Sequence, residues 1–235
     1  MNTLLEYREQ LLSGITYTIG VSVVTLLFST VIGVLLAGLT LSHLPGARLA
    51  VTAYVEVFQN IPYLIVVLFF YFGLAEFGVR LSAIQAVVVG LSLYSAAYTA
   101  EALRGGISAV SKGELTAARA FGLRESDIFR RLLLPQAVVY ALPSLTNQWV
   151  RVIKNTTVLA VIGGGDLLYQ AYQLAAQTYE VFTFYAFVAV AYWVMIIPLT
   201  RLSARAEMLA RWRRSQLGIE LRPRKSQRAA AGAGR

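Results

Sequence analysis

Long apolar stretches separated by short polar breaks dominate the hydrophobic pattern of this chain. Five such stretches run over residues 15–41, 49–72, 79–100, 136–162 and 181–199. Each approaches or exceeds the roughly 20 apolar residues that a helix needs to cross a bilayer. Turn-forming residues occupy three of the breaks: Pro45-Gly46, Phe77-Gly78 and Gly163-Gly164-Gly165-Asp166. The pattern predicts an all-α integral membrane protein with about five spanning helices.

The composition supports a membrane location, and the charges set the orientation. Hydrophobic residues make up 57% of the chain and charged residues only 14%, against roughly 25% charged residues in soluble domains. All but four of the 21 Lys and Arg residues lie in the link after the first stretch, in residues 101–135 or after residue 200. By the positive-inside rule these segments face the cytoplasm and the N-terminus faces out.

This topology divides the chain into three parts. Residues 1–12 form an extracytoplasmic N-terminal segment, and residues 13–208 form a transmembrane domain with a cytoplasmic loop at 101–135. Residues 209–235 form a basic, low-complexity cytoplasmic tail, which we expect to be disordered. The net charge of +9 therefore reflects membrane topology, and we expect contact with membrane lipids rather than with nucleic acid.

The residue inventory excludes most enzyme chemistry. There is no cysteine, and the single His43 stands in a turn-like link without the clustered ligands that a metal needs. A phosphate-binding loop needs a Gly-Lys pair that opens a helix, but "GGISAVSKGE" places Ser111 before Lys112. We expect no catalytic residues, no metal and no bound cofactor in this chain, which would not be an enzyme.

The charged block at residues 111–137, "SKGELTAARAFGLRESDIFRRLLLPQA", predicts a helical hairpin. Ser111 and Glu114 have the spacing of a capping box, and Gly122 can adopt the left-handed conformation that ends a helix. A second helix should end at Pro135. The small side chains Ala117, Ala118 and Ala120 would let a partner protein approach closely. The alternative is an amphipathic helix lying at the lipid interface.

The same block carries a family resemblance. Gly113, Ala117-Ala118, Gly122 and Leu134-Pro135 resemble the EAA signature of ATP-binding-cassette (ABC) importer permeases. The flanking "YVEVFQNIPYLIVVLFFYFGL", "AAYTAEALRGGISAVSKGE" and "LLLPQAVVYALPSLTNQWVRVIKNTTVLAVIGGGDLL" are similar to the polar amino-acid branch of that family. The resemblance covers residues 13–208. Thr116 stands where the signature usually has glutamate, and Glu114 where it usually has glutamine.

The resemblance implies a type I importer fold and a set of partners. These would be a second permease subunit, identical or homologous, two ABC ATPase subunits and an extracytoplasmic amino-acid-binding protein in a bacterial inner membrane. ATP and magnesium would be bound by the ATPases, whose clefts would receive the loop, and transport would proceed by alternating access. The coupling residues would be Gly113, Glu114, Thr116, Ala117, Ala118, Gly122 and Pro135.

Polar residues interrupt the second and fourth apolar stretches, where a charge costs roughly 2.5–3.5 kcal/mol on insertion scales and therefore suggests function. Two prolines, Pro62 and Pro143, would loosen the same two helices. One interpretation is a substrate pathway, which the resemblance also implies. The other is interhelical hydrogen bonding, including an ion pair of Glu56 with Lys154 or Arg151. The candidate residues are Glu56, Gln59, Asn60, Asn147, Arg151, Lys154, Asn155 and Thr156.

The departures from the family pattern bear on the substrate. Asn155 stands where many members have an acid, and Gln59-Asn60-Ile61 replaces the usual Arg-Gly-Thr or Arg-Asn-Thr. A missing acid disfavours a cationic substrate, whereas Arg151 and Lys154 suit a carboxylate or an amide. Glutamate, aspartate or glutamine is the preferred prediction. Import of basic amino acids or another small polar solute stays open, as does a passive channel or membrane scaffold.

Overall fold

The computed structural model describes residues 2–42 and 44–216, and every regular element within these ranges is a helix. The elements in chain order are α1 (Asn2–Glu6), α2 (Arg8–Leu41), α3 (Ala47–Asn60), α4 (Tyr63–Leu68), the π-helix η1 (Phe69–Gly73), α5 (Leu74–Glu76), α6 (Ala83–Ser108), α7 (Lys112–Ala120), α8 (Glu125–Asp127), the π-helix η2 (Ile128–Leu133), α9 (Leu134–Asn155), the 3₁₀-helix η3 (Thr156–Val161), α10 (Leu167–Thr178) and α11 (Val181–Gln216). The predicted all-α class is confirmed.

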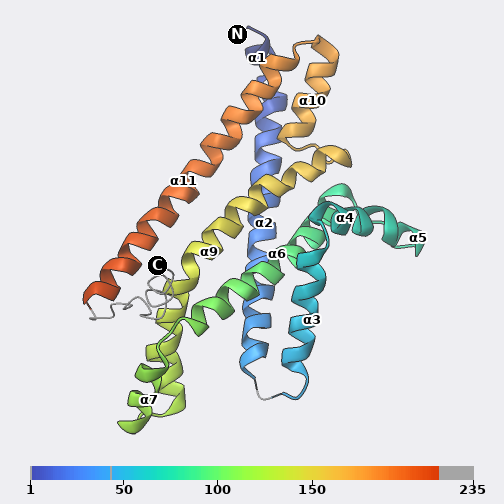
Figure 1. Cartoon of the computed structure of the whole chain (residues 1–235). Coiled ribbons are helices and arrows are strands. Elements are labelled where there is room, and N and C mark those ends of the chain that lie inside the picture. The colour runs from blue at the N-terminus through green and yellow to red at the C-terminus, as the bar shows by residue number, and fades with distance from the viewer. Residues whose placement is uncertain (1, 43, 217–235) are drawn as a thin grey trace, which may run out of the picture.

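Three of these helices are long and apolar enough to span a membrane by themselves: α2, α6 and α11 over Val181–Arg205. A fourth span is a bent pair, Ala47–Asn60 with Tyr63–Glu76. The polar α9 has 22 residues but is not among the spans found in residues 2–42 and 44–216, so the crossing predicted for residues 136–162 stays a prediction. In Figure 1 the α2–α3 link and α7 lie at the bottom and the N-terminus at the top, as the charge distribution predicts.

Helices α2 and α6 pack closely because α2 presents small residues to its neighbour. The buried positions Thr18, Ser22, Thr25, Ser29 and Gly33 recur every three to four residues along α2. A Cβ atom added at Gly33 would lie only 2.5 Å from Thr99 Cβ on α6. Without side-chain bulk the two backbones approach, which is how membrane helices gain van der Waals contact where lipid offers no hydrophobic driving force.

Two apolar clusters hold the other helices to α2. Near its N-terminus, Leu11 packs with Leu167 and Leu174 of α10 and with Phe184 of α11. Farther along, Val21 packs in a second cluster with residues of α4, α6 and η3, namely Val67, Val87, Leu91, Val158, Leu159 and Ile162. Helix α2 therefore takes part in both clusters, and its neighbour α6 is the more deeply buried of the two helices.

The second predicted span is broken rather than loosened at Pro62. The axis turns by 101° between Ala47–Asn60 and Tyr63–Glu76, because Pro62 lacks the N–H that would continue the ladder and Ile61 takes an extended conformation. The second segment then points sideways (Figure 1). Pro143, by contrast, stands inside a continuous α9.

The cytoplasmic hairpin differs from its prediction at both ends. The capping box was wrong, because Ser111 makes no side-chain cap bond to α7 and the Glu114 carboxylate instead accepts a hydrogen bond from Gln136 Nε2 at 2.9 Å. A capping box does form at Ser82 and Gln85, where α6 begins. The predicted stop at Pro135 was also wrong, since the chain passes from η2 directly into α9. The turn that precedes Pro135 is π-helical rather than α-helical, so the regular hydrogen-bond ladder is already interrupted where the proline lacks its N–H.

Gly122 was predicted correctly. Its φ of 77° is left-handed, and it ends α7 as expected. Beside it, Arg119 Nε donates to Glu125 Oε1 at 2.6 Å across the turn. This hydrogen bond lowers the pKa of the exposed Glu125 carboxyl below its ordinary value. The turn is thus held by a left-handed glycine and one surface ion pair.

The last third of the chain contains a helix that the hydrophobic pattern did not predict. After the Gly163–Gly165 turn, the buried Asp166 caps α10 by accepting from the backbone N–H of Tyr169 at 3.1 Å. Helix α11 then continues to Gln216, past residue 208 where the disordered tail was predicted to begin. The rest of that tail, residues 217–235, and His43 lie outside the described residues.

Candidate functional site

The hairpin of α7, α8 and η2 presents a mainly apolar hollow of about 410 Å³. Ala117, Ala118 and Phe121 line it from α7 and the turn, together with Leu123. Phe121 is 87% exposed and Leu123 is 51% exposed. Large apolar side chains this exposed, beside a hollow and in the loop that the charge distribution predicts to be cytoplasmic, favour a protein partner.

The predicted coupling residues occupy different parts of this hairpin. Ala117 faces out, but Ala118 is buried and packs within the hairpin. Thr116 is exposed, and its hydroxyl donates to the carbonyl oxygen of Lys112 at 2.9 Å. Gly113 is exposed near the start of α7, and Pro135 is exposed at the start of α9. Of the small alanines in the signature, Ala117 is therefore the one available to a partner.

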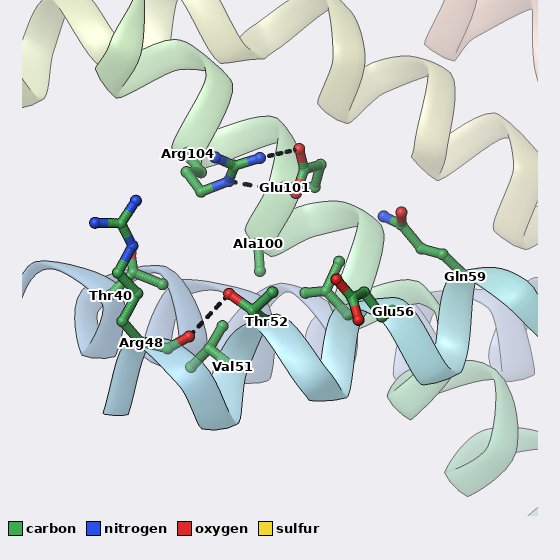
Figure 2. A pocket seen from close by; sticks show the side chains of 10 residues that line it. Thr40, Arg48, Val51, Thr52, Glu56, Gln59, Ala100, Glu101 and Arg104 are labelled. Carbon is green, nitrogen blue, oxygen red and sulfur yellow. Dashed lines mark hydrogen bonds and ion pairs between the residues drawn. The ribbon is translucent and has the colours of Figure 1, made fainter. Parts of the chain in front are cut away.

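A second cavity, also of about 410 Å³, lies between α2, α3 and α6. Figure 2 shows its lining residues, with Glu56 and Gln59 of α3 on one side and Glu101 and Arg104 of α6 on the other. Arg104 Nη2 donates to Glu101 Oε1 at 2.5 Å. Asn60 is exposed, and its side-chain amide donates to the carbonyl oxygen of Glu56 at 2.7 Å. The cavity therefore holds two of the predicted pathway residues.

Arg151 of α9 lies over an aromatic ring of α6 rather than beside an acid. Its guanidinium carbon is 5.0 Å from the centre of the Tyr98 ring, and the Tyr98 and Tyr94 hydroxyl oxygens are 3.1 Å apart. The ring of Tyr63, which follows the break at Pro62, is 6.1 Å from that of Tyr94. The predicted pair of Glu56 with Arg151 or Lys154 is absent among the ion pairs of residues 2–42 and 44–216.

The other α9 candidates do not form one site. Lys154 is exposed and Asn155 half-buried. Thr156 is fully buried, and its hydroxyl donates to the carbonyl oxygen of Ile153 at 2.8 Å. Asn147 lines a separate small cavity of about 150 Å³ between α9 and α11. Thus Arg151 and Lys154 are on the open face, whereas Thr156 is inside the bundle.

Several residues of these sites were not predicted from the sequence. Tyr94, Tyr98, Glu101 and Arg104 follow one another at spacings of four, three and three on α6, which places them along one side of the helix. That spacing could have indicated a functional face on this helix. In an apolar stretch, however, the same spacing is equally typical of residues that pack between helices. In the described part of the chain, no group of three or more His, Cys, Asp or Glu side chains could hold a metal ion.

Comparison with known proteins agrees with this arrangement. The family model for the "Binding-protein-dependent transport system inner membrane component" matches residues 7–208. The "Probable glutamine ABC transporter permease protein GlnM" of Bacillus subtilis (strain 168) is 40% identical over 200 residues, 85% of this chain and 93% of the relative. The "Arginine transport system permease protein ArtQ" of the same strain is 32% identical over 198 residues, 84% of this chain and 90% of the relative.

A solved structure supports the same assignment. A crystal structure of an amino acid ABC transporter with histidines matches with a TM-score of 0.82 and 31% identity, over 87% of this chain and 96% of the other. This similarity, the family match and the apolar helices agree with one another and decide against a passive channel or scaffold. The chain therefore belongs to the family of binding-protein-dependent transport system inner membrane components, which are the permease subunits of ABC importers and multi-pass proteins of the bacterial inner membrane.

Proposed function

We propose that this permease imports polar amino acids with a carboxylate or amide side chain: glutamate, aspartate or glutamine. It works with a second permease subunit, two ATPase subunits that bind ATP and magnesium, and an extracytoplasmic binding protein. The names of its relatives favour amino acids in general, since one is named for glutamine and another for arginine. The higher identity, 40% against 32%, is to the relative named for glutamine.

The observation that carries the substrate preference is the placement of Arg151. Its guanidinium carbon lies 5.0 Å from the centre of the Tyr98 ring, and among residues 2–42 and 44–216 no acid forms an ion pair with it, so its N–H groups are available to a planar acceptor. A guanidinium edge matches a carboxylate in bidentate geometry. Lys154, one turn farther on and exposed, adds positive charge. These two cations repel arginine or lysine and attract a carboxylate.

The hairpin supports the coupling part of the proposal. Coupling needs a rigid element that contacts a soluble partner. The hairpin presents the hollow, and its last element, η2, leads into α9 without an intervening loop. A displacement of α7 by the ATPases would therefore be transmitted along η2 to α9, the helix that carries Arg151. The candidate coupling residues are those of the signature, with Ala117 and Phe121 as the exposed contacts.

Reconstitution tests this function directly. The permease, its ATPase and its binding protein would be placed in proteoliposomes, and ATP-dependent uptake of labelled glutamine, glutamate, aspartate, arginine and lysine compared. We expect uptake of one or more of the first three in preference to arginine and lysine. Preferential uptake of arginine or lysine would overturn the substrate proposal, and uptake without ATPase would overturn the importer mechanism.

The substitution Asn155→Asp should move the preference toward cationic amino acids. A carboxylate beside Lys154 would offset its charge and could form a charge-assisted hydrogen bond, worth about 1.5–3 kcal/mol, with a cationic substrate. We expect the uptake ratio of arginine to glutamine to rise by roughly tenfold or more. Gln177→Glu, an exposed position on α10, introduces the same charge away from the pathway and should leave the ratio unchanged. An unchanged ratio in Asn155→Asp would remove Asn155 from the pathway.

A further inference from the structure

The cavity between α2, α3 and α6 has an ordered arrangement of charge. Arg48 and Glu56 line it from α3, and Glu101 and Arg104 line it from α6. Helix α3 runs away from the α2–α3 link and α6 runs toward that end of the molecule (Figure 1). Both arginines therefore lie nearer the cytoplasm than the glutamate on the same helix. In Figure 2, Arg48 and Glu56 lie apart along α3, whereas Arg104 and Glu101 lie next to each other and are joined by dashed lines.

Only two of these four charged residues form an ion pair with each other. Glu101 and Arg104 form an ion pair within one turn of α6. Arg48 and Glu56 make no ion pair within residues 2–42 and 44–216. Their positions on α3 differ by eight residues, a rise of about 12 Å, which is two turns and too far for the usual contact between helix neighbours. The cavity thus offers one free cation and one free anion at opposite ends.

The other lining residues are neutral: Gln59, Thr40 and Thr52 carry hydrogen-bonding side chains, and Val51, Val55 and Ala100 are apolar. With two arginines and two glutamates the charged lining has no net charge. Such a cavity has no reason to hold a simple anion or cation, but it matches a dipolar molecule. The α-ammonium and α-carboxylate of an amino acid form such a dipole, and a volume of about 410 Å³ is within the range of small-molecule sites.

We propose that this cavity is an inner binding site for the zwitterionic head of an amino acid at the cytoplasmic end of the pathway. The ammonium group binds between Glu56 and Glu101, and the carboxylate binds Arg104 and Arg48. Gln59 and the threonine hydroxyls contact a polar side chain. This inference rests on the proposed function, and it adds Arg48, Glu101 and Arg104 to the residues that handle substrate.

The position of the cavity gives it a role in release. Tyr98, which carries Arg151 on its ring, lies one turn before Glu101 on the same side of α6. A substrate that leaves Arg151 toward the cytoplasm therefore passes directly to the glutamate end of the cavity. Because the site faces the cytoplasm, amino acid that has accumulated inside will rebind there and slow further import.

Import into loaded proteoliposomes tests this site. Vesicles with the complete transporter would contain ATP and increasing L-glutamine, and the initial uptake of labelled L-glutamine delivered by the binding protein would be measured. We expect internal L-glutamine to inhibit uptake, and internal N-acetyl-L-glutamine, which lacks the ammonium group, to inhibit far less. Glu56→Gln and Arg48→Gln should each raise the inhibitory internal concentration at least about tenfold, the effect of one lost charge-assisted hydrogen bond. The internal inhibitory concentration should change more than the external KM, which the affinity of the binding protein sets.

Matched controls remove the same charges elsewhere. Glu76→Gln and Arg80→Gln change exposed residues near the other end of the bent span and should leave the internal inhibition unchanged. Normal uptake with no inhibition by internal L-glutamine, or equal shifts of the external KM and the internal inhibition, would overturn the inner site alone. Failure of the wild-type transporter to import any of the three proposed amino acids would overturn the proposed function, and the inner site with it.

Discussion

Replacing Gly106 by alanine is expected to destabilise the permease strongly, although it adds a single methyl group. A Cβ atom at this position would overlap the carbonyl oxygen of Ala137 and lie 2.9 Å from the Cβ of Ala141. Both obstacles belong to α9, and a backbone oxygen cannot rotate away as a side chain can. The two helices would have to separate, with a loss of about 1–3 kcal/mol from overpacking. Thermal unfolding of the detergent-solubilised protein, followed by size-exclusion chromatography, measures the effect.

The neighbouring glycine provides the control. A Cβ added at Gly105 meets nothing within 4 Å, so Gly105→Ala should be neutral or stabilise by up to about 1 kcal/mol through helix propensity. The two substitutions are chemically identical and adjacent in α6, yet we expect opposite signs. Equal transition temperatures for Gly106→Ala and the wild type would show that α6 and α9 are not in close contact in the membrane protein.

Ala117→Asp is expected to abolish coupling between ATP hydrolysis and transport while leaving the permease folded. Ala117 is exposed and lines the apolar hollow of the hairpin, so a carboxylate there would be carried into the interface with the ATPase. A charge buried without a partner costs several kcal/mol, enough for a loss of 100-fold or more in binding. Co-purification with the ATPase, and ATPase stimulation by loaded binding protein, measure the loss.

Ala120→Asp is the matched control for this substitution. Ala120 is exposed on the same helix but does not line the hollow, so an aspartate there should preserve most of the coupling. Ala118 is unsuitable, because it is buried within the hairpin and a charge there would unfold the element that is being tested. Intact transport and ATPase stimulation in Ala117→Asp would contradict the docking role of the hairpin.

The errors of sequence interpretation in this chain have identifiable physical causes. The S-x-x-E spacing at Ser111 predicted a local cap, but the Glu114 carboxylate finds Gln136, 22 residues away, as its hydrogen-bond partner. Pro135 predicted a helix end, yet the π-helix η2 leads directly into α9, so the chain is helical on both sides of the proline. In both cases a local rule was overridden by the neighbouring helix. Gly122 was predicted correctly because its left-handed φ is a property of one residue.

The pathway residues illustrate a different limit. The sequence placed Arg151 and Lys154 in the fourth apolar stretch, and both are exposed on α9. It suggested Glu56 as the partner of Lys154 or Arg151, because opposite charges attract and all three lie in apolar stretches. The actual neighbour is Tyr98, an aromatic ring that no charge pattern can identify. Glu56 instead lines a cavity with α6, on the part of the second stretch that precedes the 101° turn at Pro62.

By itself the sequence determined the membrane-spanning, all-helical class and the glycine that ends α7, because hydropathy and single special residues act locally along the chain. The family signature was recognisable for the same reason. The cytoplasmic end stays a prediction from the placement of Lys and Arg. Only the tertiary structure decided which polar side chains meet: Arg151 with Tyr98, Glu114 with Gln136, and Glu56 with Glu101 and Arg104 around one cavity. Those contacts depend on where the helices cross. The crossings are possible because small residues such as Gly33 and Gly106 let their helices approach residues that are far away in the sequence.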